Sequence, residues 1–295
     1  MHDVTNTLSQ RGQEPETNVL YLVGTPIGNL NDISIRAINI LRNVSLIACE
    51  DTRNTKKLLN YLNISNKLIS YHKFNSIKQS QFITRELEKG CSIALVSDAG
   101  MPLISDPGDI LVKELKEKGF DIICIPGPCA ALTGLISSGL DASKFTFYGF
   151  LPRTRKERKE ALEKVALSEV STILYESPKR ILKLLLELEE TCGGDRNIIL
   201  LKELTKKYEQ HFGKTIKNVI SIIKDIKPKG EFTVVIGGIN KNKINKTIYD
   251  KSLKTDLQNL IEAGLSHSAA SSFLSKKTGK SKKEIYNLIL ENDLK

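Results

Sequence analysis

The chain lacks any apolar run long enough to cross a membrane. Its longest apolar stretches, such as Val19–Val23 and Ile198–Leu201, are far shorter than the roughly 20 residues that a membrane helix needs. Cysteine is also scarce: the five cysteines form no Cys-x-x-Cys pair. This pattern predicts reduced thiols, a cytoplasmic protein and no cysteine-rich metal site.

Signatures of several enzyme classes are absent as well. No Gly-x-Gly-x-x-Gly fingerprint occurs, which disfavours a nicotinamide-dependent oxidoreductase, and there is no Gly-x-Ser-x-Gly nucleophile elbow. The four histidines share no metal-ligand spacing, so we expect no bound metal. Gly213-Lys214-Thr215 is similar to the end of a phosphate loop, but that motif would place its first glycine at Tyr208.

What is present is a globular composition with unevenly placed charge. Apolar residues make up 40% and charged residues 26%, which excludes collagen, a disordered chain and a small disulfide scaffold. Residues 1–150 carry 15 Lys/Arg and 15 Asp/Glu, whereas residues 151–240 carry 18 and 13, and residues 241–295 carry 11 and 6. The whole excess of +10 therefore lies in the second half. Such a surface favours a polyanion such as nucleic acid, or a membrane face, although a lysine-rich composition bias would also explain it.

Short β-rich runs alternate with helical periodicity from Val19 onward. The expected strands are residues 19–23, 45–49, 93–97, 121–125, 145–150, 172–175, 197–202 and 232–237. The expected helices are residues 34–41, 76–89, 108–118, 180–190 and 217–225. This alternation predicts an α/β fold with largely parallel sheets. Asp106-Pro107 and Ser177-Pro178 each predict a helix start, with a capping side chain before a proline.

The number of strands predicts two α/β lobes, because eight strands are many for one sheet in a chain of this length. We expect lobes over residues 19–127 and 128–240, divided near Pro126-Gly127-Pro128. Residues 1–18 are polar and aperiodic, which predicts a disordered tail and no signal peptide. Residues 241–295 are expected to form a polar linker, to about residue 251, and a small basic helical domain. Its helices, expected at residues 255–263, 266–277 and 281–290, resemble a helix-turn-helix.

Loops rich in glycine and proline follow the first and third strong strands. In residues 23–30, two glycines and a proline allow the backbone to approach a ligand, although a structural tight turn is an alternative. Residues 97–108 hold two Gly, two Pro and two Asp, and this loop is longer than ordinary βα loops, which favours a binding loop. Asp98 could accept hydrogen bonds there from a ribose or an amine. Pro126-Gly127-Pro128 opens a helix of small residues, for which close helix packing is the commoner cause.

Two charged segments are candidates for chemistry on RNA. At the end of the second strand, Glu50, Asp51 and Arg53 could serve as proton acceptor, hydrogen-bond acceptor and phosphate clamp. Equally, Asp51 or Thr52 could only cap the next helix while Arg53 pairs with a carboxylate. The run Arg153–Lys159 holds five cations in seven residues and is either a phosphate-contacting stripe or a solvated helix start.

Six motifs that occur in order carry a resemblance to a known family. They are Leu22–Leu30, Glu50–Arg53, Ser97–Gly100 with Ser105–Gly108, Ile125–Pro128, Gly149–Pro152 and Tyr175–Pro178. Together they resemble the ribosomal RNA small-subunit methyltransferase I branch of the tetrapyrrole methylase superfamily, over about residues 19–240. The C-terminal segment resembles the small helix-turn-helix extension of that family. Met101 departs from the pattern, because the family usually has Thr there.

The resemblance implies a methyltransferase that uses S-adenosylmethionine and methylates the ribose 2′-hydroxyl of a cytidine in the decoding centre of 16S rRNA. It also implies a homodimer, the small ribosomal subunit as partner, and a methyl donor folded into the cleft between two lobes. The residues that it assigns to the donor are Pro26, Asp98, Ala99, Gly100, Met101, Ile104, Ala130, Ala131 and Tyr175.

The residues and the resemblance together lead to two hypotheses about the site. Glu50 or Asp51 accepts the proton of the 2′-hydroxyl, while Arg53 holds a neighbouring phosphate. The RNA backbone is held by two clusters of cations, and their members are Arg153, Arg155, Lys156, Arg158, Lys159, Lys276, Lys277, Lys282 and Lys283. Two rival functions remain: a methylase of a tetrapyrrole-like small molecule, and a non-enzymatic RNA-binding or ribosome-assembly protein.

Overall fold

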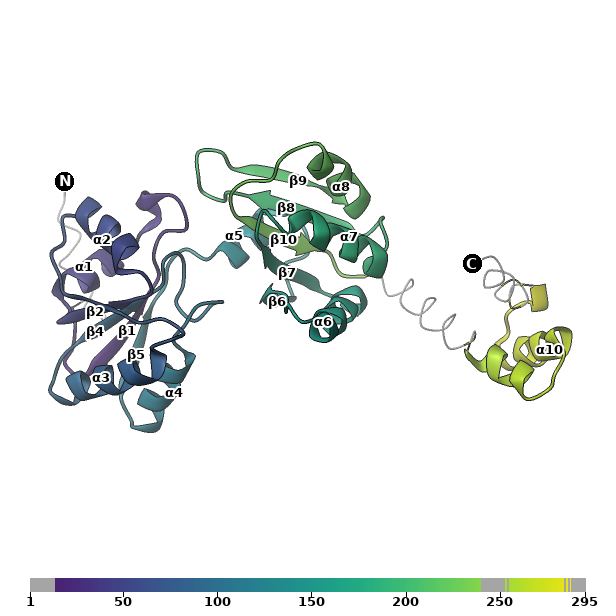
Figure 1. The fold of residues 1–295 in the computed structure, drawn as a ribbon, viewed down its shortest axis with the longest axis horizontal. Coiled ribbons are helices and arrows are strands. Elements are labelled where there is room, and N and C mark those ends of the chain that lie inside the picture. The colour runs from purple at the N-terminus through teal and green to yellow at the C-terminus, as the bar shows by residue number, and fades with distance from the viewer. Residues whose placement is uncertain (1–13, 240–252, 254, 284, 286, 288–295) are drawn as a thin grey trace. The chain divides into compact units, whose positions relative to one another are not determined.

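The computed structural model describes residues 14–239, 253, 255–283, 285 and 287 (Figure 1). Contacts divide the chain into two units, of which the first holds residues 1–166 and 170–237 and the second holds residues 167–169 and 238–295. Of the expected tail and linker, residues 1–13 and 241–251 lie outside the described residues. Glu14 accepts hydrogen bonds from Asn39 and Asn43, at 2.7 and 3.1 Å, so the described end of the expected tail contacts the helix that contains these two residues.

The first sheet of unit 1 has five parallel strands in the order β3-β2-β4-β1-β5. These are β1 (Val19–Val23), β2 (Leu46–Cys49), β3 (Leu68–Ser70), β4 (Ile93–Val96) and β5 (Asp121–Ile125). Its helices are α1 (Ile35–Asn43), α2 (Thr52–Tyr61), α3 (Ser76–Glu88) and α4 (Asp109–Glu117), after a short 3-10 helix, η2 (Leu30–Asp32). The side chains of β1 alternate between two apolar clusters, one on each face of the sheet. Helices cover both faces (Figure 1), which explains why β2 and β4 are buried throughout.

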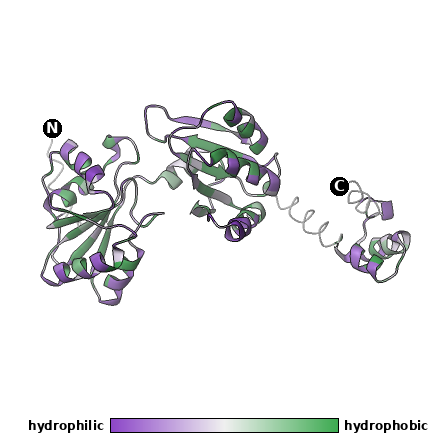
Figure 2. Ribbon diagram, in the orientation of Figure 1, coloured by the Kyte–Doolittle hydropathy of each residue, from purple (hydrophilic) through white to green (hydrophobic). Residues whose placement is uncertain are grey.

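The second sheet also has five strands, in the order β6-β7-β10-β8-β9. These are β6 (Phe145–Phe150), β7 (Ser171–Glu176), β8 (Asn197–Lys202), β9 (Gln210–Thr215) and β10 (Phe232–Ile236). One face packs on α6 (Arg155–Leu167), α7 (Ile181–Cys192) and α8 (Ile216–Lys224), and the other on α5 (Ala130–Ser137). Figure 2 shows most strands of the two sheets as hydrophobic, with β9 as a hydrophilic exception and many hydrophilic residues on the helices.

The expectation of largely parallel sheets is right for the first sheet and wrong for the second. Only β6 and β7 pair in parallel there, whereas β10 is antiparallel to β7 and β8, and β9 is antiparallel to β8. The reason lies in residues 203–209, which join β8 to β9. This connection is too short for the crossover of a dozen or more residues that parallel strands require, so β9 reverses direction. The crossover through α8 then keeps that reversed direction in β10.

Two strands were missed because neither has an apolar run. β3 has three half-buried residues, and β9, at the edge of its sheet, is largely polar. Both helices also begin later than their proline motifs predict, by two residues for α4 and by three for α7. α4 begins at Asp109, because Gly108 with φ 144° interrupts helical geometry, and α7 begins at Ile181 after a turn closed on the Ser177 carbonyl.

The second unit is helical in its described part. α10 (His267–Thr278) begins after Ser266, whose side chain accepts a hydrogen bond from the Ala269 N–H, and ends at Gly279 with φ 74°. Residues 255–262 are also helical. A small apolar cluster joins these helices through Leu253, Leu257, Ala270, Leu274 and Ile285. The predicted fold class is confirmed: an α/β protein with two sheets and a small helical C-terminal extension. The division at Pro126–Pro128, between β5 and β6, remains our proposed lobe boundary.

Candidate functional site

The loops after β1 and β5 touch through two glycines. A Cβ on Gly24 would lie 2.8 Å from Gly127 Cα and 2.6 Å from Met101 Sδ, and a Cβ on Gly127 would lie 2.9 Å from Gly24 Cα. Thr25 then pairs with Gly100 through two backbone hydrogen bonds of 2.9 and 3.0 Å. At Gly24 and Gly127, only glycine allows the two backbones to come this close. The hydrogen bonds between Thr25 and Gly100 hold the loop after β4 against the loop after β1.

The loop that follows β4 has an unusual backbone. Leu103 and Ser105 have φ values of 71° and 70°, which are uncommon for residues other than glycine. The loop also touches the second sheet, because a Cβ on Gly149 would collide with Ser105 Oγ. Such strained positions cluster at ligand-binding sites. The loop is therefore held in one conformation between the first sheet and β6.

A cavity of about 330 Å³ lies next to this loop. Its wall comprises Ile27, Ala99, Gly100, Met101, Ile104, Ser105, Asp106, Cys129, Ala130, Phe150, Tyr175, Glu176, Ser177, Pro178, Leu204, Gly230, Glu231, Phe232 and Thr233. This volume suits a small molecule, and the position at strand ends is typical of ligand sites in α/β proteins. Tyr175 packs edge-on against Phe147 and Phe150, with ring centroids 5.1 and 5.7 Å away.

Six of the nine residues expected to bind a donor line this cavity. They are Ala99, Gly100, Met101, Ile104, Ala130 and Tyr175. Pro26 and Ala131 are buried outside its wall, and Asp98 instead accepts hydrogen bonds from Asp51 N and Asn54 Nδ2, both at 3.0 Å.

Sequence reasoning missed other wall residues. Phe150 and Ser177-Pro178 stand in motifs at expected strand ends, so their position in the sequence could have predicted that they line the cavity. Leu204 and Thr233 carried no signal, since only folding of the antiparallel strands brings them to the cavity.

The wall is acidic. It contains Asp106, Glu176 and Glu231, and no lysine, arginine or histidine occurs among its residues in the described part of the chain. Burial raises the pKa of Asp106 to about 6, and the nearby carboxylates of Glu50 and Asp98 add to this rise, while hydrogen bonding with Ser97 opposes it. The predicted helix cap is thus a half-buried carboxyl group beside an apolar cavity.

Glu50, Asp51 and Arg53 lie outside the cavity wall, and the structure separates the roles of the two acids. Asp51 caps α2 by accepting a hydrogen bond from Arg53 N, and hydrogen bonds from the Arg53 side chain and backbone lower its pKa to about 2. Burial raises the pKa of Glu50, and the charge of Asp98 raises it further, whereas His72 opposes the rise. Glu50 is therefore the better proton acceptor near neutral pH.

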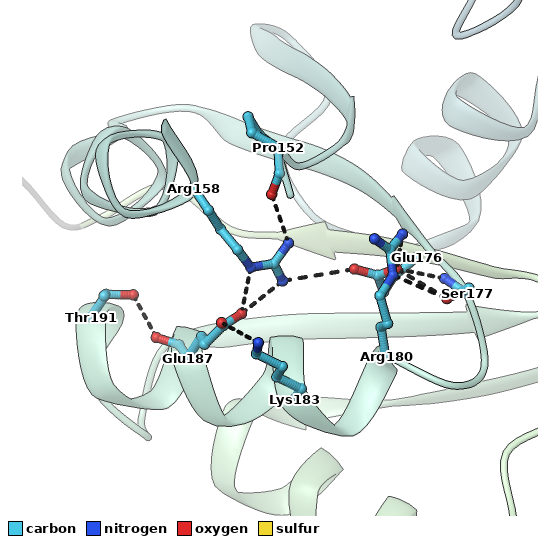
Figure 3. A network of polar contacts seen from close by, with 8 residues as sticks. All are labelled: Pro152, Arg158, Glu176, Ser177, Arg180, Lys183, Glu187 and Thr191. Carbon is cyan, nitrogen blue, oxygen red and sulfur yellow. Dashed lines mark hydrogen bonds and ion pairs between the residues drawn. The ribbon is translucent and has the colours of Figure 1, made fainter. Parts of the chain in front are cut away.

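A buried ionic network lies behind the cavity wall, and Figure 3 shows its members. The Glu176 side chain is fully buried and accepts from Ser177 N at 2.8 Å and from Arg180 Nη2 at 2.7 Å. Arg158 donates to Glu187 Oε2 through Nε and Nη2, at 2.9 and 2.7 Å, and its Nη2 lies 3.8 Å from Glu176 Oε2. The paired side chains hold α6 and α7 against the end of β7.

This network corrects one expected RNA-binding residue. Arg158 is only 8% exposed and its guanidinium is paired inside the protein, so it is not free to contact a phosphate. Helical periodicity turns it inward while its neighbours stay exposed; those neighbours are Arg153, Arg155, Lys156 and Lys159.

In the second unit, the four candidate lysines are exposed. They are Lys276, Lys277, Lys282 and Lys283. Lys277 lies 3.8 Å from Asp256, and Lys282 donates to Ser268 Oγ at 2.8 Å.

Neither a metal cluster nor a membrane helix is found in the described residues. No group of three or more His, Cys, Asp or Glu side chains there could hold a metal ion. No helix there is long and apolar enough to cross a membrane.

Comparison with known proteins places the chain in a family. The family model of tetrapyrrole (corrin/porphyrin) methylases matches residues 19–220. A "Ribosomal RNA small subunit methyltransferase I" of Synechocystis is 41% identical over 273 residues, which cover 92% of this chain and 98% of the relative. The chain belongs to the ribosomal RNA small subunit methyltransferase I family. A member from Bacillus subtilis is 44% identical and is covered over 79% of its length, with 78% of this chain.

Solved structures support the tetrapyrrole methylase fold of this family member. A cobalt precorrin-4 methyltransferase superposes with a TM-score of 0.59 at 15% identity, over 78% of this chain and 98% of that protein. Diphthine synthase superposes with a TM-score of 0.57 at 15% identity, over 74% of this chain and 90% of that protein. At such identities the likeness concerns the fold alone.

Proposed function

We propose that this protein transfers a methyl group from S-adenosylmethionine to the 2′-hydroxyl of a cytidine ribose in the decoding centre of 16S rRNA. The observation that carries the proposal is the cavity of about 330 Å³, whose wall combines the loop after β4 with residues of the second sheet. The names of the relatives supply the class of substrate, and the sequence motifs behind the resemblance supply the finer assignment.

The residues of the cavity wall fit this methyl donor. Ile27, Met101, Ile104 and Leu204 offer apolar surface for the flat adenine ring and its ribose, and the carboxyl groups of the wall suit a cationic molecule. S-adenosylmethionine supplies an activated methyl group on a positively charged sulfur. The part of the protein is to hold the two reactants in line, which alone is worth roughly 7–11 kcal/mol of the barrier.

Glu50 is our candidate for the acceptor of the 2′-hydroxyl proton. Its pKa is raised by burial, whereas Asp51 is ion-paired with Arg53 at 2.7 Å and caps α2. Arg53 is the candidate for holding a substrate phosphate, because its side chain is 86% exposed and a guanidinium binds phosphate through two N–H groups.

Two exposed basic surfaces are our candidates for holding the RNA backbone. The first consists of Arg153, Arg155, Lys156 and Lys159, and the second of Lys276, Lys277, Lys282 and Lys283. Exposed lysines and arginines bind phosphates and release counterions, which makes such binding sensitive to salt.

We also propose a cytoplasmic homodimer. Leu132 and Ile136 of α5 are 45% and 76% exposed, and a second copy of the chain would cover them. Light scattering of the purified protein tests the dimer, and a single-chain mass at micromolar concentration would contradict it.

One experiment tests the function as a whole. Ribosomal RNA from a strain lacking this protein is mapped for 2′-O-methyl groups by mass spectrometry, with wild-type and Glu50→Gln genes returned in parallel. We expect one decoding-centre cytidine to lose its methyl group and to regain it only with the wild-type gene. An unchanged map would contradict the assignment and favour a small-molecule methylase, while failure to bind S-adenosylmethionine in calorimetry would favour a non-enzymatic RNA-binding protein.

A further inference from the structure

The charge of the cavity wall selects among small molecules. Its ionisable residues include three acids, and no basic residue is part of it within the described chain. A wall that carries only negative charge favours a cationic occupant over a neutral or anionic one, and the effect is strong where the surroundings are apolar.

Two of the three acids are already neutralised. The Glu176 carboxylate is fully buried and forms an ion pair with Arg180 at 2.7 Å, so the positive charge of Arg180 compensates it. The Glu231 side chain is 76% exposed and paired with Lys206 at 2.9 Å. Asp106 is the remaining acid, and no ion pair of its carboxylate occurs among the described residues.

Asp106 stands at a fixed place in the wall. It follows Ser105, which touches Gly149 of the second sheet, and it precedes the turn at Gly108 that leads into α4. Burial is the main cause that raises the pKa of Tyr175, and the charge of Asp106 adds a smaller part; both residues line the same cavity. The carboxyl group is thereby held between the strained loop and the end of β7.

Methyl transfer changes the charge of the donor at one atom. The sulfur of S-adenosylmethionine is a sulfonium cation, whereas the sulfur of the product, S-adenosylhomocysteine, is neutral; the amino-acid part of the molecule keeps its charges. We propose that the Asp106 carboxylate recognises the sulfonium charge and so makes the cavity bind the methyl donor more tightly than the demethylated product. This inference rests on the proposed function.

Such recognition would serve turnover. Once the methyl group has left, the ligand loses the charge that Asp106 attracts, and the product is held less firmly than the substrate. A carboxylate suits this task because a sulfonium offers no N–H or O–H donor, so its positive charge is the feature that distinguishes it from the neutral sulfur of the product.

The titration of Asp106 makes the selectivity dependent on pH. Burial and the charges of Glu50 and Asp98 favour its neutral form, while burial raises the pKa of the neighbouring Tyr175, which keeps that phenol uncharged near neutral pH. Only the ionised carboxylate attracts a cation. Selectivity for the donor should therefore be full well above pH 6 and should decline as the pH is lowered through about 6.

Calorimetry with three ligands tests the proposal. The ligands are S-adenosylmethionine, S-adenosylhomocysteine and sinefungin, which carries a positively charged amine near the position of the sulfonium. We expect Asp106→Asn to weaken the donor and sinefungin by roughly tenfold or more and to change the affinity for the product by less than about threefold. Asp109→Asn is the matched control, because it removes an exposed carboxylate only three positions away and should alter none of the three affinities.

A second measurement keeps the test independent of the variant's folding. In the wild-type protein, the ratio of the two affinities, donor to product, should fall as the pH goes from 7.5 to 5.5, a range chosen to span about pH 6. The charge of the shared amino-acid part cancels in this ratio. Equal loss of all three ligands in Asp106→Asn, or a ratio that does not change with pH, would overturn the proposal. If the wild-type protein bound no S-adenosylmethionine, the proposed function would fail with it, so the two failures are distinguishable.

Discussion

Arg53 Nη2 lies 2.7 Å from Asp51 Oδ2, and the Arg53 backbone N–H donates to Asp51 Oδ1 at 2.9 Å. The two residues thus close a local ring at the start of α2, in which the carboxylate is both a helix cap and one half of an ion pair. The same hydrogen bonds lower the pKa of Asp51 to about 2, which makes it a weak base. Of the two neighbouring acids, only Glu50 retains the basicity that proton transfer requires.

This difference predicts unequal effects of two similar substitutions. Glu50→Gln should lower the single-turnover rate of methyl transfer by about 10²- to 10⁴-fold, the usual contribution of a general base. Asp51→Asn should lower it by less than about tenfold, because asparagine also caps helices well. Rapid-quench measurements with saturating donor and RNA provide the rates, and unchanged donor affinity in both variants is the control. Equal losses in the two variants would show that the acids are not distinguished in this way.

The ion pair of Arg158 and Glu187 predicts a stability effect within the basic run. Removing one partner of a buried pair typically costs about 3–5 kcal/mol, so Arg158→Ala should lower the free energy of unfolding by about that amount. Arg155→Ala, on the same helix but exposed, should change it by less than about 0.5 kcal/mol. Urea unfolding followed by circular dichroism measures both. An Arg158→Ala protein as stable as Arg155→Ala would mean that the network does not stabilise the fold.

The exposed members of the run predict salt-dependent RNA binding. Arg155→Glu with Lys156→Glu should weaken binding to small-subunit RNA and reduce the slope of log affinity against log salt by roughly 0.7–0.9 per lost phosphate contact. Lys113→Glu with Lys116→Glu makes the same change of charge on α4, where both lysines are exposed, and should leave the slope unaltered. Filter binding across a salt series gives the slopes. An equal reduction in the two variants would indicate only a general effect of net charge.

The raised pKa of Asp106 predicts how the free energy of unfolding depends on pH. The pKa of this carboxyl is about 6 in the folded protein, above its ordinary value of 3.8, so folding binds protons and ionised Asp106 destabilises the fold. The penalty is complete above pH 6 and disappears below about pH 4. Asp106→Asn should therefore stabilise the ligand-free protein by on the order of 1 kcal/mol at pH 7.5, after allowance for solvent screening, and by nothing at pH 3.5.

Thermal melts of the ligand-free protein at these two pH values measure the effect. Asp109→Asn is again the control, since its exposed carboxylate should not give a comparable gain. A lower melting temperature for Asp106→Asn at pH 7.5 would show that the ionised carboxylate is stabilised by a partner.

Much of the first sheet could be predicted from local sequence. β1, β2 and β4 are buried apolar runs, and β5 is a mainly apolar, partly buried run at the edge of the sheet; such runs are visible without a structure. The same holds for the cavity loop, since an accumulation of Gly, Pro and Asp at the end of a buried strand predicts a ligand site. The strands and directions of the second sheet are harder to predict from sequence. The direction of β10 depends on the short connection before β9, and β9 itself is polar and has no apolar pattern.

The candidate site was predictable to the extent that its residues stand in motifs at strand ends. Gly24, Gly100, Met101, Ala130 and Tyr175 belong to such motifs, and the structure brings all of them to one cavity or to its supporting contacts. Leu204 and Thr233 do not, since they reach the cavity only through the pairing of strands distant in sequence.

Amino-acid sequence alone was sufficient for the fold class, the family and the uneven distribution of charge, because each of these is carried by residue types and their order. The tertiary structure decided which charges are free. Arg158 is turned inward by the geometry of α6 and paired, and Asp51 is neutralised by a residue two positions away. Asp106 has no ion pair within the described part of the chain and lies in a mainly apolar wall. Burial and ion pairing depend on distances in space, which residues far apart in the chain set together.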